Sequence, residues 1–383
     1  MRLRRIAYVV KMFPKLSETF IANEIIALQG RGLEVRVLSL LPPAEGLRHE
    51  FFAKAGLDQI TSWDPGAFLP LLREFQPQWL HAHFATEPTE AARDLAKEVG
   101  CPFTFTAHGY DIHRKPPPDF HARALAARAV ITVSQANARH ITEHFGVPTD
   151  RIHVIPSGVD CELFCPPSSK AREDDPTQPP LLVCVARHVP VKNLTLLLEM
   201  CALLRDRRVK FRCALVGDGP TQADLQATAS RLGLGTLVEF AGAATQPEVV
   251  KWWQRAAVAL LTSDHEGMPV CLMEAGACAV PAVATAVGGI PELVEDGITG
   301  CLAPAGDVSG LGDAVQQLLQ NPPLAARLGQ AARQRVREHF ALSIQVDRLL
   351  TLWTEILGSK DARVDSAAQF VSYAGQDRDG AQP

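Results

Sequence analysis

The feature that most constrains the fold of this chain is the regular alternation of short apolar runs with longer, mostly helical stretches. Such runs, rich in branched side chains, are typical of buried strands, and their alternation with helices predicts parallel βαβ units. The first series of predicted strands covers Arg5–Val10, Glu34–Leu40, Trp79–Ala82, Phe103–Thr106, Val130–Val133 and His153–Ile155. The second covers Leu181–Ala186, Phe211–Val216, Leu237–Phe240, Val258–Thr262, Val280–Ala284 and Gly300–Leu302.

This repetition predicts an α/β protein with two doubly wound domains in tandem. A chain of 383 residues, 47% of them apolar, is long enough to form two such cores. We assign residues 1–165 to an N-terminal domain and 181–340 to a C-terminal domain. Residues 166–180, rich in Pro, Ser and charged side chains, predict a linker. Residues 341–357 predict a helix that packs back on the first domain, and 358–383 predict a mobile tail.

The charge balance argues against a nucleic-acid-binding protein. The chain has 38 basic and 42 acidic residues, with no concentrated basic stripe. The one local excess is at the start of the chain, where we favour a solvated terminus over a weak contact with an anionic membrane. Its members are Arg2, Arg4, Arg5, Lys11 and Lys15.

The sequence indicates a cytoplasmic location, with any membrane association peripheral. The first residues do not form a secretory signal, and the longest apolar stretch, 270–290, is interrupted by Glu274 and Pro281. The nine cysteines lack the spacing of a zinc site, so reduced thiols are expected.

Two carboxylates stand at a strand-to-helix junction in the second half. In parallel sheets of this kind, ligands bind beyond the carboxyl ends of the strands. Glu266 follows the predicted strand Val258–Thr262, and Glu274 falls inside the next helix, which is expected to begin near Met268–Val270. Pro269 suits the first helical turn, whose free N–H groups can receive hydroxyls or a phosphate. Taken alone, a loop Glu and a paired helical Glu remain an equally good interpretation.

The longer motif resolves this choice by resemblance. Glu266 and Glu274, separated by seven residues, are followed by the segments 275–277, 281–292, 296–297 and 300–307. This block resembles the donor site of retaining glycosyltransferases of family 4, and the resemblance extends over nearly the whole chain to about residue 350. It implies the GT-B fold, in which two Rossmann-like domains face each other across a cleft.

The resemblance also implies roles for particular residues of the second domain. Glu266 would bind hydroxyls of the donor sugar and Glu274 the ribose, since carboxylates accept charge-assisted hydrogen bonds from vicinal hydroxyls. Arg187 and Lys192, on one loop after a strand, would neutralise the diphosphate, whereas alone they would be read as solvated side chains. The other residues implied in donor binding are Gly217, Gly219, Gly267, Met268, Pro269 and Val270.

In the first domain, His108 and Asp111 follow the predicted strand Phe103–Thr106. They match a His-Gly-x-Asp motif of the family, which implies that His108 faces the sugar and the reaction centre. Asp111 would contact the acceptor or hold the loop by binding backbone N–H groups. His81 and His83 share one face of a strand, but the sequence shows no third ligand, and we predict no metal site.

The loop after the first strand departs from the common family pattern, which has a Gly-Gly pair there. Its Phe-Pro-x-x-Ser-Glu-Thr-Phe segment resembles a subgroup that builds bacterial exopolysaccharide, including colanic-acid-like repeat units. Ser17 is expected to cap a helix, with Leu16 and Ile21 as a hydrophobic staple. We hypothesise that free N–H groups at Ser17, Glu18 and Thr19 replace the Gly-Gly backbone in binding donor or acceptor.

The resulting expectation is a retaining glycosyltransferase without a cofactor or an obligatory metal. Its donor would be a UDP- or GDP-sugar, and its acceptor a glycan or a lipid-linked glycan at the inner membrane face. Two alternatives remain open: a non-hydrolysing sugar-nucleotide epimerase or phosphorylase of the same architecture, and a non-catalytic nucleotide-sugar sensor. Trp252 and Trp253 are expected to pack in the core rather than to stack on a sugar.

Overall fold

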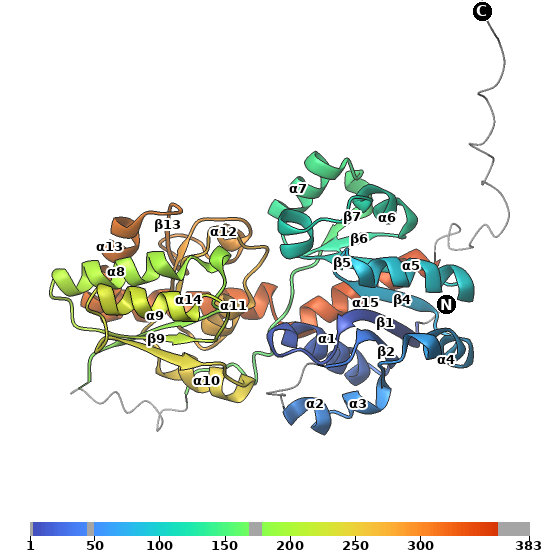
Figure 1. The fold of residues 1–383 in the computed structure, drawn as a ribbon, viewed down its shortest axis with the longest axis horizontal. Coiled ribbons are helices and arrows are strands. Elements are labelled where there is room, and N and C mark those ends of the chain that lie inside the picture. Colours follow the sequence, from blue (N-terminus) through green and yellow to red (C-terminus); the bar gives the residue numbers. More distant parts are fainter. Residues whose placement is uncertain (1–2, 44–49, 168–177, 359–383) are drawn as a thin grey trace, which may run out of the picture.

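A computed structural model describes residues 3–43, 50–167 and 178–358 of the chain (Figure 1). Most of the predicted linker, 166–180, and nearly all of the predicted tail, 358–383, lie outside the described residues. The domain boundaries given above therefore stay predictions at those two places.

The first half forms a seven-stranded, all-parallel sheet with the strand order β3-β2-β1-β4-β5-β6-β7. Six of its strands match the predicted series to within two residues at either end; the short β3 has too few apolar residues to be recognised. The strands are β1 (Arg5–Met12), β2 (Glu34–Leu41), β3 (Thr61–Ser62), β4 (Trp79–His83), β5 (Phe103–Ala107), β6 (Val130–Thr132) and β7 (Ile152–Val154).

The second half forms a six-stranded, all-parallel sheet with the order β10-β9-β8-β11-β12-β13. All six strands were predicted. They are β8 (Leu181–Val185), β9 (Arg212–Val216), β10 (Val238–Gly242), β11 (Val258–Leu261), β12 (Ala282–Thr285) and β13 (Gly300–Ala303).

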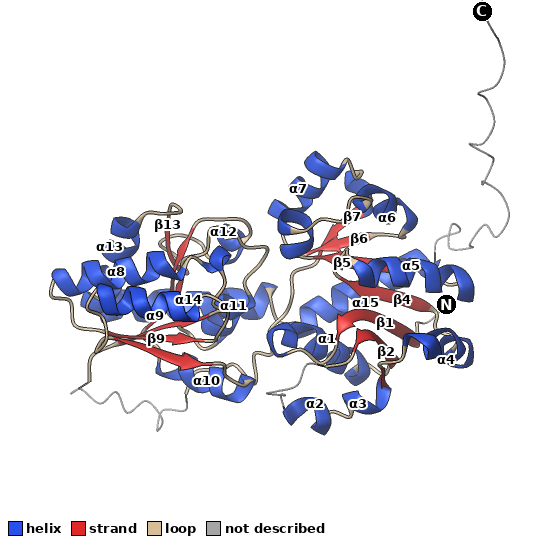
Figure 2. Ribbon diagram, viewed as in Figure 1, coloured by secondary structure: helices blue, strands red, loops and turns tan. Residues whose placement is uncertain are grey.

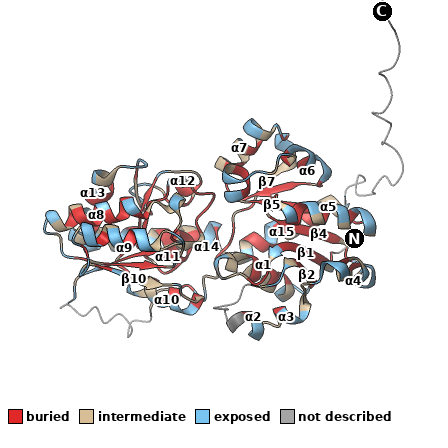
Figure 3. Ribbon diagram, viewed as in Figure 1, coloured by how far each residue is buried: buried red, intermediate tan, exposed pale blue. Residues whose placement is uncertain are grey.

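Helices cover both faces of each sheet (Figure 2). Buried residues, coloured red in Figure 3, lie along the strands and on the helices that face them. Each domain has one hydrophobic core on either face of its sheet. In the first half the helices are α1 (Thr19–Gly30), α2 (Glu50–Lys54), α3 (Leu57–Ile60), α4 (Phe68–Phe75), α5 (Glu87–Val99), α6 (Phe120–Ala126) and α7 (Gln135–Phe145). In the second half they are α8 (Leu194–Asp206), α9 (Gln222–Arg231), α10 (Gln246–Arg255), α11 (Val270–Ala277), α12 (Ile290–Leu293), α13 (Val308–Gln320), α14 (Pro322–His339) and α15 (Leu342–Gly358).

Short helical turns complete the loops. The 3₁₀ turns are η1 (Leu16–Glu18), η2 (Pro65–Ala67), η4 (Thr149–Arg151) and η5 (Pro190–Lys192), and η3 (Tyr110–Arg114) is a single π-helical turn. Among the described residues, no helix combines the length and the apolar content needed to cross a bilayer.

The last helix returns to the first domain, as expected. Val346, Leu349 and Trp353 of α15 are buried in the same core as Ile21 and Ile25 of α1 (Figure 1). This helix is separated from α14 at Phe340–Ala341, where Val159 lies between them. Its N–H donates to Phe340 O at 2.9 Å and its own carbonyl accepts from Leu342 N at 2.9 Å.

Candidate active site

The loops that follow β8 and β11 are joined by an ion pair between two predicted site residues. Lys192 Nζ donates to Glu266 Oε1, and the Ser263 hydroxyl donates to the same oxygen at 2.5 Å. The backbones are joined as well, because Asp264 N donates to Val191 O at 2.9 Å. The site thus presents a cation and a carboxylate held together in an interior position.

The ammonium of Lys192 stays charged despite its burial. Burial lowers its pKa, but Glu266 and neighbouring thiols raise it by more, so the net pKa lies above the ordinary value for lysine. Arg187, on the same loop, is exposed and makes no ion pair or side-chain hydrogen bond within the described part of the chain. The loop therefore offers one paired and one unpaired cation.

Gly217 and Gly219 let the turn after β9 lie directly against this loop. A Cβ on Gly217 would lie 2.0 Å from Ala186 O, and one on Gly219 would lie 2.4 Å from His188 O. Both residues also have positive φ, 136° and 157°, which side chains rarely adopt. Any side chain at these positions would push the β9 turn away from the loop that carries Arg187 and Lys192.

Glu274 lies inside α11, as predicted, and burial raises its pKa to about 7. The indole N–H of Trp253, which is fully buried, donates to Glu274 Oε2 at 3.4 Å. Trp253 is thus a core residue that also orients a candidate ribose ligand, a role the sequence did not suggest. The helix begins at Val270, with Pro269 just before it at the N-cap, and the loop residues Gly267, Met268 and Pro269 are buried.

In the first domain, Asp111 organises the loop that carries His108. Its carboxylate accepts hydrogen bonds from His108 N at 2.8 Å and from Ala85 N at 2.6 Å. Burial raises the pKa of Asp111 to about 7, although these backbone hydrogen bonds lower it. Asp111 makes these contacts from η3, and π-helical turns occur often at functional sites.

The two loops meet at paired glycines. A Cβ on Gly109 would lie 3.3 Å from Gly267 N, and one on Gly267 would lie 3.2 Å from Gly109 N. The His108 loop and the Glu266 loop therefore approach each other backbone to backbone, so that larger side chains would separate them.

A second contact between the domains uses Glu292. Its two carboxylate oxygens accept from Gln135 N and Ala136 N, both at 2.8 Å. These are the first two residues of α7, so the carboxylate of one domain sits at a helix N-terminus of the other, which is a favourable place for a negative charge. The sequence contained Glu292 within the family motif but gave it no role.

His108 is also the end of a buried hydrogen-bonded chain. Its Nε2 lies 3.2 Å from His83 Nδ1, and His83 Nε2 lies 3.2 Å from Glu24 Oε1. Glu24 supplies a third potential metal ligand beside His81 and His83, which the sequence did not reveal. The three side chains lie close enough together to hold a metal ion. Both nitrogens of His81, however, already bind protein: Thr104 Oγ1 at 2.9 Å and Thr106 Oγ1 at 3.1 Å.

Comparison with known proteins shows the family to which the chain belongs. A model described as Glycosyltransferase Family 4 matches residues 17–163, and one described as Glycosyl transferases group 1 matches residues 167–335. A GDP-mannose-dependent α-(1-6)-phosphatidylinositol monomannoside mannosyltransferase of Mycolicibacterium smegmatis is 33% identical over 73% of this chain and 76% of its own length. The chain is a family 4 glycosyltransferase.

Two further proteins resemble this glycosyltransferase over most of their length. An Escherichia coli K12 protein described as a colanic acid biosynthesis glycosyltransferase, WcaL, is 27% identical over 88% of this chain and 96% of its own. The Anabaena protein HepE, solved in complex with UDP-glucose, superposes with a TM-score of 0.76 at 18% identity, over 92% of this chain and all of its own. The latter likeness shows the shared GT-B fold of two Rossmann-like domains.

The N-terminal loop of this glycosyltransferase differs from the expectation. Ser17 does not cap a helix: it lies within η1, and α1 begins at Thr19 without a side-chain cap. The Glu18 N–H is not free either, because it donates to Lys15 O at 3.1 Å. This 3₁₀ hydrogen bond satisfies one of the three donors that were expected to be free. The side chain of Leu16, and with it the predicted staple, lies outside the described residues.

Two aromatic residues beside His108 were also missed. The rings of Phe20 and Phe84 lie with their centroids 5.1 Å and 4.6 Å from that of His108. Phe20 immediately follows Ser17–Thr19, so the N-terminal loop does adjoin His108. The hypothesis on free backbone N–H groups stays a prediction for Ser17 and Thr19 only.

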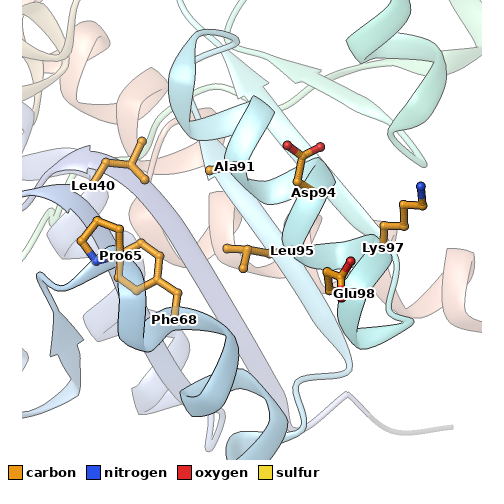
Figure 4. Close-up of a pocket in the computed structure, with 8 residues that line it drawn as sticks. All are labelled: Leu40, Pro65, Phe68, Ala91, Asp94, Leu95, Lys97 and Glu98. Carbon is orange, nitrogen blue, oxygen red and sulfur yellow. The ribbon is translucent and has the colours of Figure 1, made fainter.

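The surface also has a hollow of about 420 Å³ in the first domain (Figure 4). It lies between the end of β2, α4 and α5, and no predicted site residue lines it. Its lining residues are Leu40, Pro65, Phe68, Ala91, Asp94, Leu95, Lys97 and Glu98.

Proposed function

We propose that this glycosyltransferase moves a hexose from a UDP- or GDP-sugar to an acceptor hydroxyl, with retention of configuration and without an obligatory metal ion. The second domain binds the donor and the first domain binds the acceptor. The observation that carries the proposal is the Lys192–Glu266 ion pair. The contact between Gly109 and Gly267 brings the His108 loop next to the loop of Glu266. Cations, a sugar-binding carboxylate and a histidine are thereby collected at the carboxyl ends of two sheets.

In this mechanism, cationic side chains take the place of a metal ion. The bond between the anomeric carbon and the phosphate oxygen breaks, and the acceptor oxygen bonds to the same face of the anomeric carbon. The departing phosphate oxygen takes the proton of the acceptor hydroxyl. Arg187 and Lys192 stabilise the charge that develops on this phosphate, and no carboxylate base is needed.

Lys192 and Glu266 form a pair that a donor would separate. Before the donor binds, each neutralises the other in a buried position. A diphosphate competes for Lys192, which leaves the Glu266 carboxylate ready to accept hydrogen bonds from sugar hydroxyls. Glu274, oriented by Trp253, binds the ribose, and His108 faces the sugar.

For the acceptor we propose a growing polysaccharide repeat unit, free or lipid-linked, with the enzyme cytoplasmic and peripheral at the inner membrane face. The support is the resemblance to WcaL, whose name places it in colanic acid biosynthesis, and to a mannosyltransferase named for phosphatidylinositol monomannoside. The basic start of the chain supports membrane contact only weakly, because Lys11 pairs with Glu87 and Lys15 with Glu18.

Calorimetric binding of UDP, GDP and ADP, with and without EDTA, tests the donor site. We expect one nucleotide to bind equally well in EDTA, to lose binding in Glu274→Ala, and to bind more weakly in Arg187→Ala. Arg231→Ala, which removes an exposed arginine from α9, is the matched control and should bind as the unmodified protein does. Binding of none of the three nucleotides, or binding abolished by EDTA, would contradict the proposal.

Product analysis separates transfer from the alternatives. An epimerase would convert the sugar nucleotide without an acceptor, and a sensor would bind it without turnover. Transfer requires an acceptor sugar and releases nucleoside diphosphate in equal amount.

A further inference from the structure

The buried chain that ends at His108 begins at a carboxylate surrounded by hydrogen-bond donors. Glu24 Oε1 lies 2.5 Å from the Tyr8 hydroxyl and 3.2 Å from His83 Nε2, and Gln345 Nε2 donates to Oε2. Tyr8, Glu24 and His83 are all fully buried, and Gln345 is nearly so. These residues come from β1, α1, β4 and α15, so several elements hold one polar network in place.

The orientation of Gln345 is set independently of Glu24. Its Oε1 accepts from Gly158 N at 2.6 Å, so its amide NH₂ must point to Glu24. Burial, followed by the adjacent Glu24, raises the Tyr8 pKa well above the ordinary value, so the phenol keeps its proton and donates it. Glu24 consequently acts as an acceptor on both oxygens, which suits a buried carboxylate.

This arrangement determines where the imidazole protons lie. His83 donates from Nε2 to Glu24. Tyr8, His83 and Gln345 give the carboxylate three hydrogen bonds, which satisfy it without a second proton on His83. His83 Nδ1 is then a bare acceptor, and only His108 Nε2–H can donate to it across 3.2 Å.

His108 is left with a bare Nδ1. Burial, followed by His83, lowers the His108 pKa well below the ordinary value, so its ring carries a single proton. Within the described part of the chain, Nδ1 makes no hydrogen bond, and the residue is partly exposed on the loop that meets Gly267.

We propose that Glu24 and His83 are positioning residues that fix His108 as the Nε2–H tautomer, so that Nδ1 accepts a hydrogen bond from a sugar hydroxyl. The part that concerns the sugar rests on the function proposed above, whereas the tautomer is a property of the protein alone. Carboxylates elsewhere fix a histidine tautomer in the same way.

Long-range ¹H–¹⁵N correlation spectra of the unmodified protein, labelled at histidine, test the tautomer directly. The chain has 12 histidines, and His108→Gln identifies the signal of interest by its loss. We expect a protonated Nε2 and a bare Nδ1 on His108. A protonated Nδ1, or a doubly protonated His83, would overturn the proposal even if every variant failed to fold.

Glu24→Gln should exchange donor and acceptor in each hydrogen bond from position 24 to His108. A change in packing alone would not have this effect. Because Gln345 keeps its NH₂ toward position 24, the introduced amide must turn its oxygen to Gln345 and its NH₂ to Tyr8 and His83. His83 then accepts at Nε2 and donates from Nδ1, which moves the His108 proton to Nδ1. We expect about tenfold weaker binding of UDP-glucose or GDP-mannose, the worth of one hydrogen bond, with binding of UDP or GDP unchanged.

Adding Gln345→Glu to Glu24→Gln provides the rescue. The introduced carboxylate at position 345 accepts from Gly158 N and from the introduced amide, whose oxygen again faces Tyr8 and His83. We expect the Nε2–H tautomer of His108 and sugar-nucleotide binding to return. An equal loss of sugar-nucleotide binding in the single and double variants would indicate that the network has only a structural role, and would overturn the proposal.

The readouts separate this inference from the proposed function. An Nε2–H tautomer that reverses and recovers as described, in a protein that binds neither UDP-glucose nor GDP-mannose, would refute the function and leave the network assignment intact. Metal-independent transfer by a protein with a protonated Nδ1 would do the opposite.

Discussion

The two halves of the candidate site are held together by different physical means. In the second domain, charged groups contact each other directly at loops: Lys192 pairs with Glu266, and Arg187 is exposed beside them. In the first domain, the half-buried His108 is held by a chain of buried hydrogen bonds that runs through His83 to the Glu24 carboxylate.

The difference teaches how each half can respond to a substrate. An ion pair at a loop can exchange one partner for a phosphate, because the incoming anion replaces the lost interaction. A buried hydrogen-bonded chain cannot exchange partners without leaving a polar atom unsatisfied. The donor half is therefore suited to rearrangement on binding, and the His108 half to presenting a fixed acceptor.

The largest effect is expected for Lys192→Met, which removes the positive charge and keeps most of the side-chain volume. We expect kcat to fall by about 10²–10³, the scale of losing one preorganised donor at a developing oxyanion. Steady-state turnover measures the effect. Lys210→Met, at an exposed lysine between α8 and β9, is the matched control and should leave turnover unchanged.

A double variant distinguishes catalysis from stability. Lys192→Met leaves Glu266 buried without its cation, so the melting temperature should fall as well. Adding Glu266→Gln removes the stranded charge and should restore the melting temperature without restoring turnover. Recovery of turnover together with stability would show that the pair only holds the fold.

A smaller, pH-dependent effect is expected at Glu274, whose pKa is raised by burial from its ordinary value of 4.5 to about 7. In the role proposed for it, its ionised form accepts hydrogen bonds from ribose hydroxyls. With a pKa of about 7, binding of UDP-glucose or GDP-mannose should weaken about tenfold between pH 8 and pH 6. Calorimetry with the sugar nucleotide avoids the titration of a terminal phosphate.

Glu274→Gln supplies the control and a check on the sign. The variant should bind weakly at both pH values, without the tenfold change. A carboxyl with a raised pKa in the folded state binds more protons there than in the unfolded chain, so its contribution to stability is lost as the pH rises through about 7. Thermal unfolding should therefore favour the variant over the unmodified protein at pH 8 more than at pH 5; equal pH dependence would contradict the raised pKa.

Much of the fold was predictable because parallel strands buried on both faces are apolar along their whole length. All six strands of the second sheet and six of the first were found in this way, and the exception, β3, is only Thr61–Ser62. The N-cap of α1 was wrongly predicted. Ser17 has the side chain of a typical N-cap residue, but it lies within the preceding turn, η1. Local propensity does not reveal which of two adjacent turns the chain adopts.

The places of the candidate donor residues in the fold were predictable because these residues follow strands within a few positions. The network behind His108 was not, since Tyr8, Glu24 and His83 are far apart in sequence and Gln345 joins them only when α15 returns to the first domain. One signal was present: Glu24 lies three residues after Ile21 and four before Leu28, on the apolar face of its helix. A carboxylate at such a position has to find partners in the core.

The smallest predicted effect concerns Glu292, the residue that joins the two halves. Its carboxylate accepts from Gln135 N and Ala136 N at the start of α7. A charge at a helix N-terminus is worth about 0.3–1 kcal/mol, so Glu292→Gln should weaken the association of the domains and raise the acceptor KM by up to about fivefold. Binding of UDP or GDP alone should not change, because the proposed nucleotide contacts are all in the second domain.

Glu295→Gln is the matched control, because Glu295 pairs with Arg335 inside the second domain and, among the described residues, makes no side-chain hydrogen bond or ion pair with α7. Small-angle scattering should show an increased radius of gyration for Glu292→Gln and none for Glu295→Gln. An unchanged radius and acceptor KM in Glu292→Gln would mean that the glycine contact at Gly109 and Gly267 suffices to join the domains. In that case the rearranging donor half and the fixed His108 half are aligned by backbone packing alone, and side-chain charge contributes only within each half.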